Sequence, residues 1–415
     1  MTRRGRSMHI VVVDSTITTP PTGGAHTFLV ELCTALVGRG HRVTLVTEPG
    51  PDQSLTNTMQ MACVEVIDAM WRSVDLPEER AARLAAWVNG NRADVYVVSV
   101  SPDAGWLAVP LLESRVGTVS VTHSDGPTFY EPLKHYSDFV DCAVGVSQET
   151  ARKIVSYCGV PTARAHHIPY GVGSLTPAEA EARIRNAASR VDPLRVAYVG
   201  RLVQSQKRVL DLVPLAEEMR RRGVKFELHV IGEGPERRQL EKGFAAAGLN
   251  SQVTFWGWLR SNDVKRRLQE LDVLVLLSEL EGLPVAMLEA MGHGVVPVVT
   301  RIESGAAELV SEGVNGFLVN VGDFATFADR FAELERDRAR LATMSQAAWE
   351  TSRAYTVERM VERYLELFNE IRSGDSTRPR VASGYPVMRS CVSPYPFWLR
   401  KIKRRVLVAT GRGHY

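Results

Sequence analysis

The chain has 415 residues, of which 45% are hydrophobic and 23% charged, a balance that is typical of a globular protein and excludes a disordered or collagen-like one. Because this length exceeds the size at which a single core keeps growing, we expect two domains with a cleft between them. The formal charge of +3 includes nine Arg or Lys and no acid in residues 378–415, so the remaining 41 basic and 47 acidic residues form an acidic body, for which no nucleic-acid partner is expected.

The first part of the chain alternates short β-branched runs with longer helical stretches. The runs are bounded by turn residues and lie at residues 10–13, 43–46, 95–100, 116–121 and 142–146. Between the first two runs, Phe28, Leu32 and Leu36 recur at helical spacing within residues 27–39, and Gly40 follows as a C-terminal stop. This alternation predicts a parallel sheet with helices packed on it.

The alternation breaks after Gly171 and resumes near residue 195, with a charged, Ala-rich stretch at 177–190 in between. Further strands are predicted at residues 195–199, 226–231, 253–255, 273–277 and 296–299, separated by helices at 209–222, 236–247, 263–270 and 284–291. The order predicts an α/β fold of two doubly wound, Rossmann-like domains. Ligands of such sheets bind at the carboxyl ends of the strands, so the loops that follow strands are the places to search for chemistry.

The loop at residues 20–26 joins the first predicted strand to its helix and contains Gly23 and Gly24. Paired glycines allow a backbone to approach a ligand closely, and the helix start that follows offers unpaired amide donors to an anion. A tight turn without a ligand explains the same residues equally well. The loop matches neither the Gly-x-Gly-x-x-Gly dinucleotide pattern nor a P-loop.

Two cations follow the predicted strand at 195–199. Arg201 comes directly after its end, and Lys207 precedes the next predicted helix. A guanidinium that grips phosphate with two hydrogen bonds and an ammonium at a helix start make a candidate diphosphate clamp. Two ordinary surface cations are the alternative, and the position at the carboxyl end of a strand favours the clamp.

The segment 278–294 carries the strongest pattern in the chain. A strand is predicted to end just before it, and a short loop then holds Glu281 and Gly282. Pro284 stands where the next helix begins, a position at which its missing N–H costs nothing. Glu289 follows about one and a half turns into that helix.

Each part of this segment suits one part of a nucleotide sugar. Glu281 can hold sugar hydroxyls, and Glu289 can accept the two hydroxyls of a ribose. The exposed amides of Gly282 and Leu283 can face a phosphate. Two glutamates at this separation are common on helices, but the complete spacing with Gly, Pro and the preceding strand favours a site over coincidence.

Further motifs accompany this segment over roughly residues 8–372. They are Gly23-Gly24, Val146-Ser147, Gly200-Arg201-Leu202 with Lys207, Ile231-Gly232-Glu233-Gly234-Pro235, Phe255-Trp256-Gly257, Glu281 and Glu289 with Ala290-Met291 and Gly294, Pro297-Val298-Val299, and Glu308 with Gly313-Val314-Asn315-Gly316-Phe317-Leu318-Val319. In this order and spacing the chain resembles the retaining glycosyltransferases of family 4.

The chain also departs from the usual motifs of that family. Pro169-Tyr170-Gly171-Val172 stands where the family often has Pro-Asn-Gly-Val, Glu279 precedes a shortened Glu281-Gly282-Leu283-Pro284, and Gly292-His293 replaces small residues at the end of the helix. None of these changes removes a charge from the expected donor site.

The resemblance implies the GT-B fold, in which two Rossmann-like domains face each other and a C-terminal helix crosses back to the N-terminal domain. Residues 8–175 would then bind the acceptor and residues 193–350 the nucleotide-sugar donor. Residues 356–372 would form the crossover helix, and residues 373–415 a basic tail.

The resemblance also implies roles for the charged residues. Arg201 and Lys207 would neutralise the diphosphate, Glu281 would orient the donor sugar, and Glu289 would bind the ribose. His123, which matches a strand-end histidine of the family, would lie beside the donor sugar and the acceptor, with a purely structural histidine as the alternative.

Two pairs of residues would complete the donor site. Gly23 and Gly24 would close over the phosphates from the other domain, and Trp256 and Gly257 would lie near the nucleobase.

These roles predict the transfer of a hexosyl group, with retention of configuration, from a nucleoside-diphosphate sugar to a small-molecule, lipid-linked or polysaccharide acceptor. No Asp-x-Asp occurs in the chain, and cationic side chains and helix amides can stabilise the departing diphosphate, so we expect no metal and no other cofactor. Two alternatives stay open. One is a non-catalytic sugar-nucleotide-binding regulatory or scaffolding protein of the same fold, and the other is a nucleotide-dependent dehydrogenase, against which the missing glycine fingerprint argues.

The tail contains a second amphipathic pattern, at residues 397–409. One helical face would carry Trp398, Leu399, Ile402, Val406 and Ala409, and the rest Arg400, Lys401, Lys403, Arg404 and Arg405. This pattern suits an anionic membrane surface, and a tail packed on the acidic body or left in solvent is the alternative.

The cysteines and the apolar runs bear on the compartment. The scattered, odd set Cys33, Cys63, Cys142, Cys158 and Cys391 argues against both a disulfide framework and a zinc site. No uncharged apolar run approaches the roughly 18–20 residues that span a bilayer. We therefore expect a cytoplasmic protein, with membrane contact only as a peripheral protein at the inner face.

Overall fold

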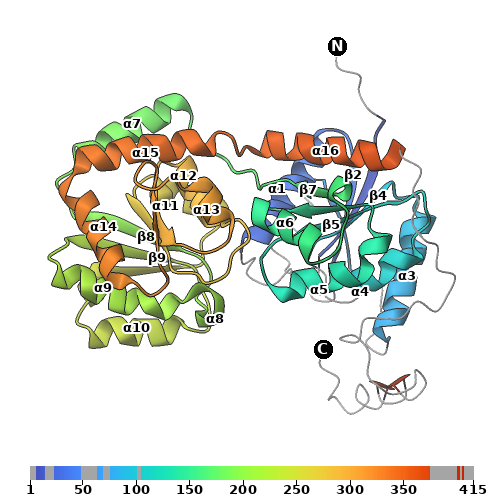
Figure 1. Ribbon diagram of the computed structural model, residues 1–415, viewed down its shortest axis with the longest axis horizontal. Coiled ribbons are helices and arrows are strands. Elements are labelled where there is room, and N and C mark those ends of the chain that lie inside the picture. The colour runs from blue at the N-terminus through green and yellow to red at the C-terminus, as the bar shows by residue number, and fades with distance from the viewer. Residues whose placement is uncertain are drawn as a thin grey trace.

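The computed structural model describes residues 6–14, 23–47, 63–68, 75–100, 104–373, 400–401 and 404–405. Within these residues the chain forms two α/β domains that lie side by side, with the N-terminal domain on the right in Figure 1. The prediction of two Rossmann-like domains is confirmed.

The sheet of the N-terminal domain has seven parallel strands among the described residues, in the order β3-β2-β1-β4-β5-β6-β7. The strands are β1 (His9–Val13), β2 (Arg42–Thr47), β3 (Glu65–Asp68), β4 (Val95–Val98), β5 (Gly117–Thr122), β6 (Cys142–Gly145) and β7 (Ala165–His167). The helices are α1 (Gly24–Gly38), α3 (Pro77–Gly90), α4 (Ala104–Ala108), α5 (Pro127–Tyr136) and α6 (Gln148–Ser156).

The C-terminal domain has a six-stranded parallel sheet in the part of the chain that the structure describes, in the order β10-β9-β8-β11-β12-β13. The strands are β8 (Leu194–Val199), β9 (Phe226–Ile231), β10 (Val253–Gly257), β11 (Val273–Leu276), β12 (Val296–Thr300) and β13 (Phe317–Val319). The helices are α7 (Pro177–Ala188), α8 (Gln204–Lys207), α9 (Leu212–Arg221), α10 (Arg237–Ala246), α11 (Ser261–Leu268), α12 (Val285–Gly292), α13 (Gly305–Leu309), α14 (Phe324–Arg336) and α15 (Arg338–Ser352), and α16 (Val357–Ser373) follows them in the chain.

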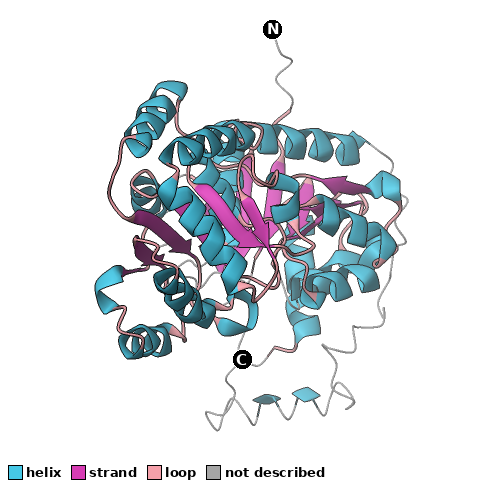
Figure 2. Ribbon diagram, turned by 60° about the vertical axis from the view of Figure 1, so that its left-hand side comes forward, coloured by secondary structure: helices cyan, strands magenta, loops and turns pink. Residues whose placement is uncertain are grey.

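The central strands are buried on both faces because helices cover both sides of each sheet (Figure 2). Every residue of β1 and of β11 is buried, which explains why these strands are continuous apolar runs without alternation. Buried apolar residues on one face of the first sheet form one cluster with those of the second sheet, and this cluster includes Tyr170 and Val172, while the other face of the first sheet packs in a separate cluster.

The strand order reverses between β1 and β4 in the first sheet and between β8 and β11 in the second. Chains leave the carboxyl ends of the two strands in opposite directions at such a point and open a crevice there. Asp14 and Ser99 follow β1 and β4 at the first reversal, and Gly200 and Ser278 lie just beyond β8 and β11 at the second.

Helix α16 returns to the N-terminal domain, where it lies over α1 and β5 (Figure 1). The return begins beside Gly171, where an added Cβ would lie 2.5 Å from the Cα of Val357. Further along, Tyr364 packs against Phe28 of α1, with ring centroids 5.8 Å apart. The crossover helix is thus part of the core of the N-terminal domain.

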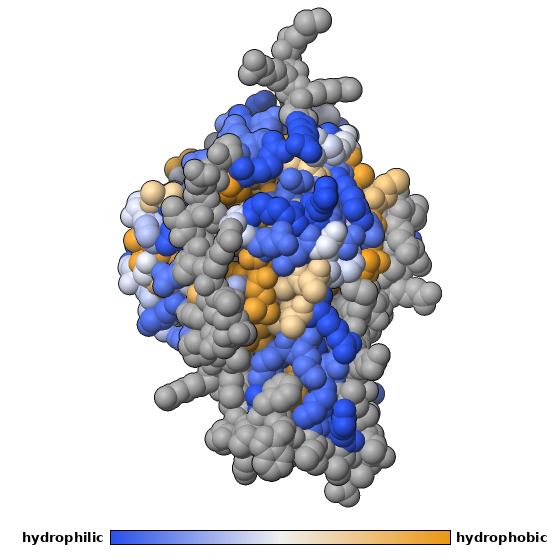
Figure 3. Space-filling model, turned by 90° about the vertical axis from the view of Figure 1, so that its right-hand side faces the viewer, coloured by the Kyte–Doolittle hydropathy of each residue, from blue (hydrophilic) through white to orange (hydrophobic). Residues whose placement is uncertain are grey.

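Figure 3 shows the surface at the end of the molecule that the N-terminal domain forms. Its described residues are mostly hydrophilic there, with a narrow band of hydrophobic residues near the middle. Among the helices that the structure describes, none is both long enough and apolar enough to cross a membrane.

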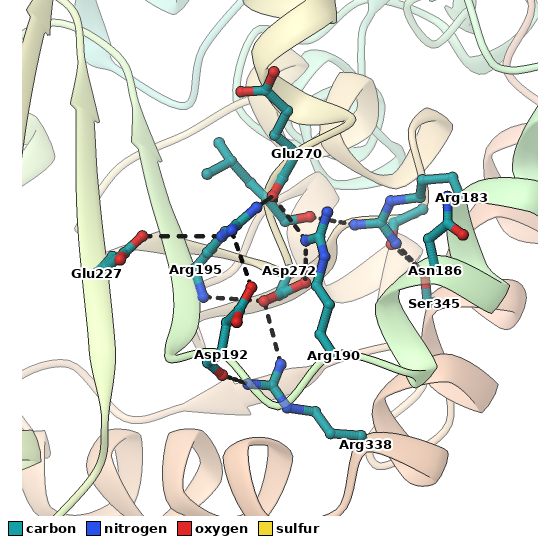
Figure 4. Close-up of polar contacts among 12 residues, drawn as sticks. Arg183, Asn186, Arg190, Asp192, Arg195, Glu227, Glu270, Asp272, Arg338 and Ser345 are labelled. Carbon is teal, nitrogen blue, oxygen red and sulfur yellow. Dashed lines mark hydrogen bonds and ion pairs between the residues drawn. The ribbon is translucent and has the colours of Figure 1, made fainter.

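A polar cluster fastens α7 to the amino end of the second sheet (Figure 4). Asp272, which is fully buried, accepts a hydrogen bond of 3.0 Å from the backbone N–H of Arg195 and pairs with Arg338 at 3.3 Å. Arg190 lies 3.5 Å from the other carboxylate oxygen, and Arg183 of α7 donates to Ser345 at 2.6 Å. Because the cluster lies opposite the carboxyl ends of the strands, we assign it to the stability of the domain.

The structure differs from the predicted elements in two respects. Strands β3, β7 and β13 were not predicted, because they have only three or four residues each and all three are sheet edges. Lys207 precedes a helical segment that begins at Val209, as predicted, but it is also the last residue of the one-turn helix α8, which was not predicted. The following residue, Arg208, leaves the helical conformation and separates α8 from that segment and α9.

Candidate functional site

The loop between β11 and α12, residues 277–284, forms the centre of the candidate site. Its Gly282 lies against the N-terminal domain, and a Cβ added there would overlap the backbone oxygen of His123. Only glycine leaves room for so close an approach. Leu283, the next residue, is buried beneath α13. We call this segment the donor loop.

A second contact joins the starts of two helices across the domain boundary. Gly24 begins α1, and a Cβ added there would lie 2.6 Å from the Cγ2 atom of Val285, the first residue of α12. Gly23 precedes it at φ 109°, a conformation that favours glycine. The structure therefore brings the predicted glycine pair to the end of the donor loop, while residues 20–22 of the predicted loop lie outside the described residues.

Lys207 and Glu281 form an ion pair inside the site, with 2.5 Å between the Nζ and Oε1 atoms. The side chains are only 16% and 10% exposed, so solvent screens the pair weakly. The two residues come from the loops at the carboxyl ends of β8 and β11. The structure thus places an ammonium and a carboxylate, both predicted from the sequence, side by side at the strand-order reversal.

Arg201 lies at the rim of the same region and is exposed. Its guanidinium donates to Oε1 of Gln206 at 2.8 Å, and Gln206 in turn donates to the backbone oxygen of Leu280 at 3.1 Å. The backbone oxygen of Gln206 accepts a hydrogen bond of 3.0 Å from the amide of Glu279. Gln206, which the sequence did not single out, therefore ties α8 to the donor loop.

Arg208 adds an ionic connection between the same two segments. Its guanidinium contacts Asp211 at 2.6 Å and also pairs with Glu279 of the donor loop. The φ angle of Arg208 is +48°, in the left-handed region that costs a non-glycine residue about 1 kcal/mol. The hydrogen bonds to Glu279 and Asp211 raise the pKa of Arg208 and offset this strain. Glu279 thus has a structural role, because it pairs with Arg208.

Glu289 lies on α12, where its side chain is partly covered by α1 and α11. Burial raises the pKa of Glu289 to about 7, Lys265 acts in the opposite direction, and Glu31 of the N-terminal domain adds to the rise. The Nζ atom of Lys265 lies 4.0 Å from Glu31. Glu289, which was predicted to bind the ribose, thus lies near charged side chains of both domains.

Trp256 was predicted to lie near a nucleobase, and the structure engages its ring within its own domain. The indole N–H donates to Nδ1 of His229 at 3.1 Å, and the guanidinium of Arg267 lies 3.7 Å from the ring centroid. The neighbouring Gly257, at φ +69°, leaves its carbonyl to accept a hydrogen bond from Gly232 at 2.8 Å.

The ring of His123 is buried in a chain of hydrogen bonds in the N-terminal domain. Its Nε2 lies 2.9 Å from the hydroxyl of Ser99, which donates to Asp14 at 2.9 Å. Its Nδ1 lies 2.7 Å from the hydroxyl of Tyr170. Since the Ser99 hydroxyl donates its hydrogen bond to the carboxylate, Nε2 of His123 carries the hydrogen and Nδ1 accepts from Tyr170.

This network holds the imidazole in one neutral form, and burial lowers the pKa of His123 to about 3. Both ring nitrogens have partners inside the domain, whereas the backbone oxygen of His123 faces Gly282. The structure therefore places the backbone of the histidine against the donor loop, and a position of its ring beside the donor sugar and the acceptor stays a prediction. Asp14, Ser99 and Tyr170 were not predicted, because only the folded chain brings them together.

Two family models match the two halves of the chain. The model described as Glycosyltransferase Family 4 matches residues 22–173, and the model described as Glycosyl transferases group 1 matches residues 180–351. The second match contains the donor loop, α12 and both cations. The chain belongs to the group 1 glycosyltransferase family.

Curated relatives of this glycosyltransferase agree with that assignment. It is 29% identical over 269 residues to the putative colanic acid biosynthesis glycosyltransferase WcaL of Escherichia coli, covering 59% of this chain and 63% of the relative. It is 28% identical over 286 residues to the 2-deoxystreptamine N-acetyl-D-glucosaminyltransferase of Streptomyces fradiae, covering 62% of this chain and 67% of the relative. Matches to the first curated relatives span between 36% and 63% of their length.

Solved structures share the fold of this glycosyltransferase. HepE of Anabaena, determined in complex with UDP-glucose, superposes with a TM-score of 0.71 at 17% sequence identity, covering 88% of this chain and all of that chain. Among the described residues of the glycosyltransferase, no three His, Cys, Asp or Glu side chains gather as metal ligands.

Proposed function

We propose that this glycosyltransferase moves a hexosyl group from a nucleoside-diphosphate sugar to an acceptor hydroxyl, with retention of configuration at the anomeric carbon. The observation that carries the proposal is the pair of Lys207 and Glu281 at the strand-order reversal of the second sheet. HepE was solved with UDP and with UDP-glucose, which supports uridine nucleotides as the first donors to test.

In the proposed reaction the acceptor oxygen attacks the anomeric carbon from the face that the diphosphate leaves. The new carbon–oxygen bond forms as the bond to the phosphate oxygen breaks, and the acceptor proton passes to that departing oxygen. Lys207 and Arg201 balance the negative charge that develops on the diphosphate, and positioned charges of this kind act where charge appears in the transition state.

A bound diphosphate would compete with Glu281 for the ammonium of Lys207. Phosphate oxygens can accept the hydrogen bonds that the carboxylate now accepts at 2.5 Å, which leaves Glu281 to accept hydrogen bonds from sugar hydroxyls. The ion pair thus holds both side chains in the site until Lys207 binds the diphosphate and Glu281 binds the sugar hydroxyls.

Nucleotide binding tests the donor class. A ligand that binds only the folded protein raises its melting temperature, so UDP, GDP and ADP are compared with NAD at equal concentrations. We expect a rise with at least one nucleoside diphosphate and none with NAD. A rise with NAD alone would contradict the proposal, and binding of nucleotide sugars without any turnover would favour the non-catalytic regulatory or scaffolding protein.

The proposal includes catalysis without a metal, because the two cations and the backbone amides at the start of α12 supply the positive charge. We expect EDTA to leave the transfer rate within a factor of two. Loss of activity in EDTA that manganese or magnesium restores would contradict this part of the proposal.

We also propose a peripheral position at an anionic membrane, through the basic segment at residues 397–409. Most of that segment lies outside the described residues, but Arg400 and Lys401 contact α3, where Arg400 pairs with Glu78 at 2.7 Å and Lys401 also pairs with Glu79. These two contacts support the competing explanation, in which the tail packs on the acidic body. Deletion of residues 378–415 should abolish co-sedimentation with anionic liposomes at low salt, and equal sedimentation of both proteins would contradict the membrane role.

A further inference from the structure

Glu308 belongs to α13, a short helix that lies directly on the donor loop. The amide of Gly305, the first residue of α13, donates to the backbone oxygen of Gly282 at 2.7 Å. A Cβ added at Gly305 would overlap Leu283, so the helix and the loop pack without a gap. A displacement of α13 would therefore also displace the donor loop.

The carboxylate of Glu308 reaches across the domain boundary to the start of α6. Its Oε1 accepts a hydrogen bond of 3.3 Å from the amide of Glu149, and the amide of Gln148 also donates to the carboxyl group. The first amides of a helix have no partners within the helix, and a negative charge is favoured beside them.

Helix α6 satisfies only part of its own first turn. The N-cap residue Ser147 accepts a hydrogen bond from the amide of Thr150 at 3.1 Å, which leaves the amides of Gln148 and Glu149 without a partner from their own domain. The side chain of Glu149 pairs with Arg152 at 2.6 Å instead. The cap of α6 is thus completed by a residue of the other domain.

Among the described residues, the basic side chain in contact with the carboxylate of Glu308 is His167, whose Nε2 lies 3.8 Å from Oε2. Burial lowers the pKa of His167 to about 4, so this imidazole is neutral at pH 7. Burial also raises the pKa of Glu308, which means that the two amides of α6 compensate only part of the cost of covering its carboxylate.

We infer that Glu308 is a positioning residue that locks the two domains in their closed arrangement and holds the donor loop against His123. The covered carboxylate of Glu308 stabilises the protein only while the two amides of α6 donate hydrogen bonds to it. These hydrogen bonds form only when the two domains are in contact. Separation of the domains breaks both hydrogen bonds and, through Gly305, releases the donor loop from the N-terminal domain.

The experiment measures closure and turnover separately. Small-angle X-ray scattering of the wild-type protein, Glu308→Ala and Glu308→Gln gives the radius of gyration with and without UDP, and steady-state kinetics with the preferred donor gives kcat and KM. Glu217→Ala, on the exposed face of α9, is the matched control. Gln148→Pro removes one of the two amide donors of α6, because proline has no N–H. The helix should tolerate this change, since proline is favoured at the first position of a helix and the preceding Ser147 is already extended at ψ 162°.

We expect Glu308→Ala and Gln148→Pro each to enlarge the radius of gyration and to lower kcat about tenfold, with the Kd for UDP changed less than twofold. The Gln variant keeps an acceptor and should lie between Ala and wild type. In the double variant the effects should not add, because both changes remove the same contact. Wild-type scattering curves for both single variants, or a loss of kcat without a change in scattering, would overturn the inference.

The scattering result does not depend on the proposed reaction. If the wild-type protein turns over no nucleotide sugar, the proposed function fails, while the expansion of the Glu308 and Gln148 variants still tests the lock.

Discussion

The ammonium of Lys207 lies 2.5 Å from a carboxylate oxygen of Glu281, and this ion pair joins the loops that follow β8 and β11. Each partner keeps the other charged group inside a site that is largely closed to solvent. Replacing one partner therefore affects the chemistry of the site, and it also lowers the stability of the protein because the other charged group is left unpaired.

Glu281→Gln should lower kcat/KM for the preferred donor at least about a hundredfold, since a positioned electrostatic contact contributes roughly 3 kcal/mol at the transition state. It should also lower the free energy of unfolding by about 1 kcal/mol, because Lys207 loses its partner. Steady-state kinetics and urea unfolding measure the two effects, with Glu217→Gln on α9 as the control. Activity within threefold of wild type would remove Glu281 from the donor site.

Arg201→Ala and Lys207→Ala should each weaken the binding of UDP at least tenfold while changing the binding of uridine less than twofold, because a guanidinium or an ammonium acts on the phosphates. Isothermal titration calorimetry with both ligands measures the difference. Lys225→Ala, an exposed lysine at the amino end of β9, is the control for a lost positive charge. Equal losses for nucleotide and nucleoside would place both cations away from the diphosphate.

Glu289→Gln should reduce the dependence of stability on pH. With a pKa raised from 4.5 to about 7, Glu289 binds a proton more tightly in the folded protein than in the unfolded one. Its contribution is therefore fully present below pH 4.5 and is lost as the pH rises through 7, by roughly 3 kcal/mol. The Gln variant should melt higher than wild type at pH 8 and at the same temperature at pH 4.5, a comparison in which all other charged groups are the same in both proteins. A constant difference between the proteins would contradict the raised pKa.

Arg208→Gly and Arg208→Ala should separate the backbone strain at this position from its ion pairs. Both variants lose the contacts with Asp211 and Glu279, but only glycine adopts the left-handed conformation without strain. We expect the Gly variant to be more stable than the Ala variant by about 1 kcal/mol in urea unfolding. An Ala variant that is at least as stable as Gly would indicate that residue 208 does not hold this conformation in solution.

The sequence predicts the second domain well because its strands are short runs rich in apolar and β-branched residues that alternate with helical stretches. The strand predicted at residues 226–231 has those bounds in the structure, and the donor loop lies between β11 and α12 where its Gly, Glu and Pro residues indicated. Edge strands such as β3 are short and half-exposed, so their pattern does not stand out from that of loops.

The contacts between distant segments could not be predicted. The state of His123 depends on Asp14, Ser99 and Tyr170, which lie 109, 24 and 47 residues away along the chain and meet only after the sheet has formed. The same holds for the strained backbone of Arg208, because the side chain of this residue pairs with Glu279, which lies 71 residues further along the chain. The catalytic role of His123 stays a prediction, because its ring has no nitrogen free of partners.

The central claim is that this glycosyltransferase uses a nucleoside-diphosphate sugar as its donor. The most direct measurement is the release of nucleoside diphosphate from a panel of UDP-, GDP- and ADP-sugars by the wild-type protein and by Glu281→Gln, without acceptor and with a mixture of sugar acceptors. The account predicts release from one nucleotide class by the wild-type protein, faster with acceptor, and at least about a hundredfold less release by the variant. No release from any donor, or equal release by both proteins, would contradict it.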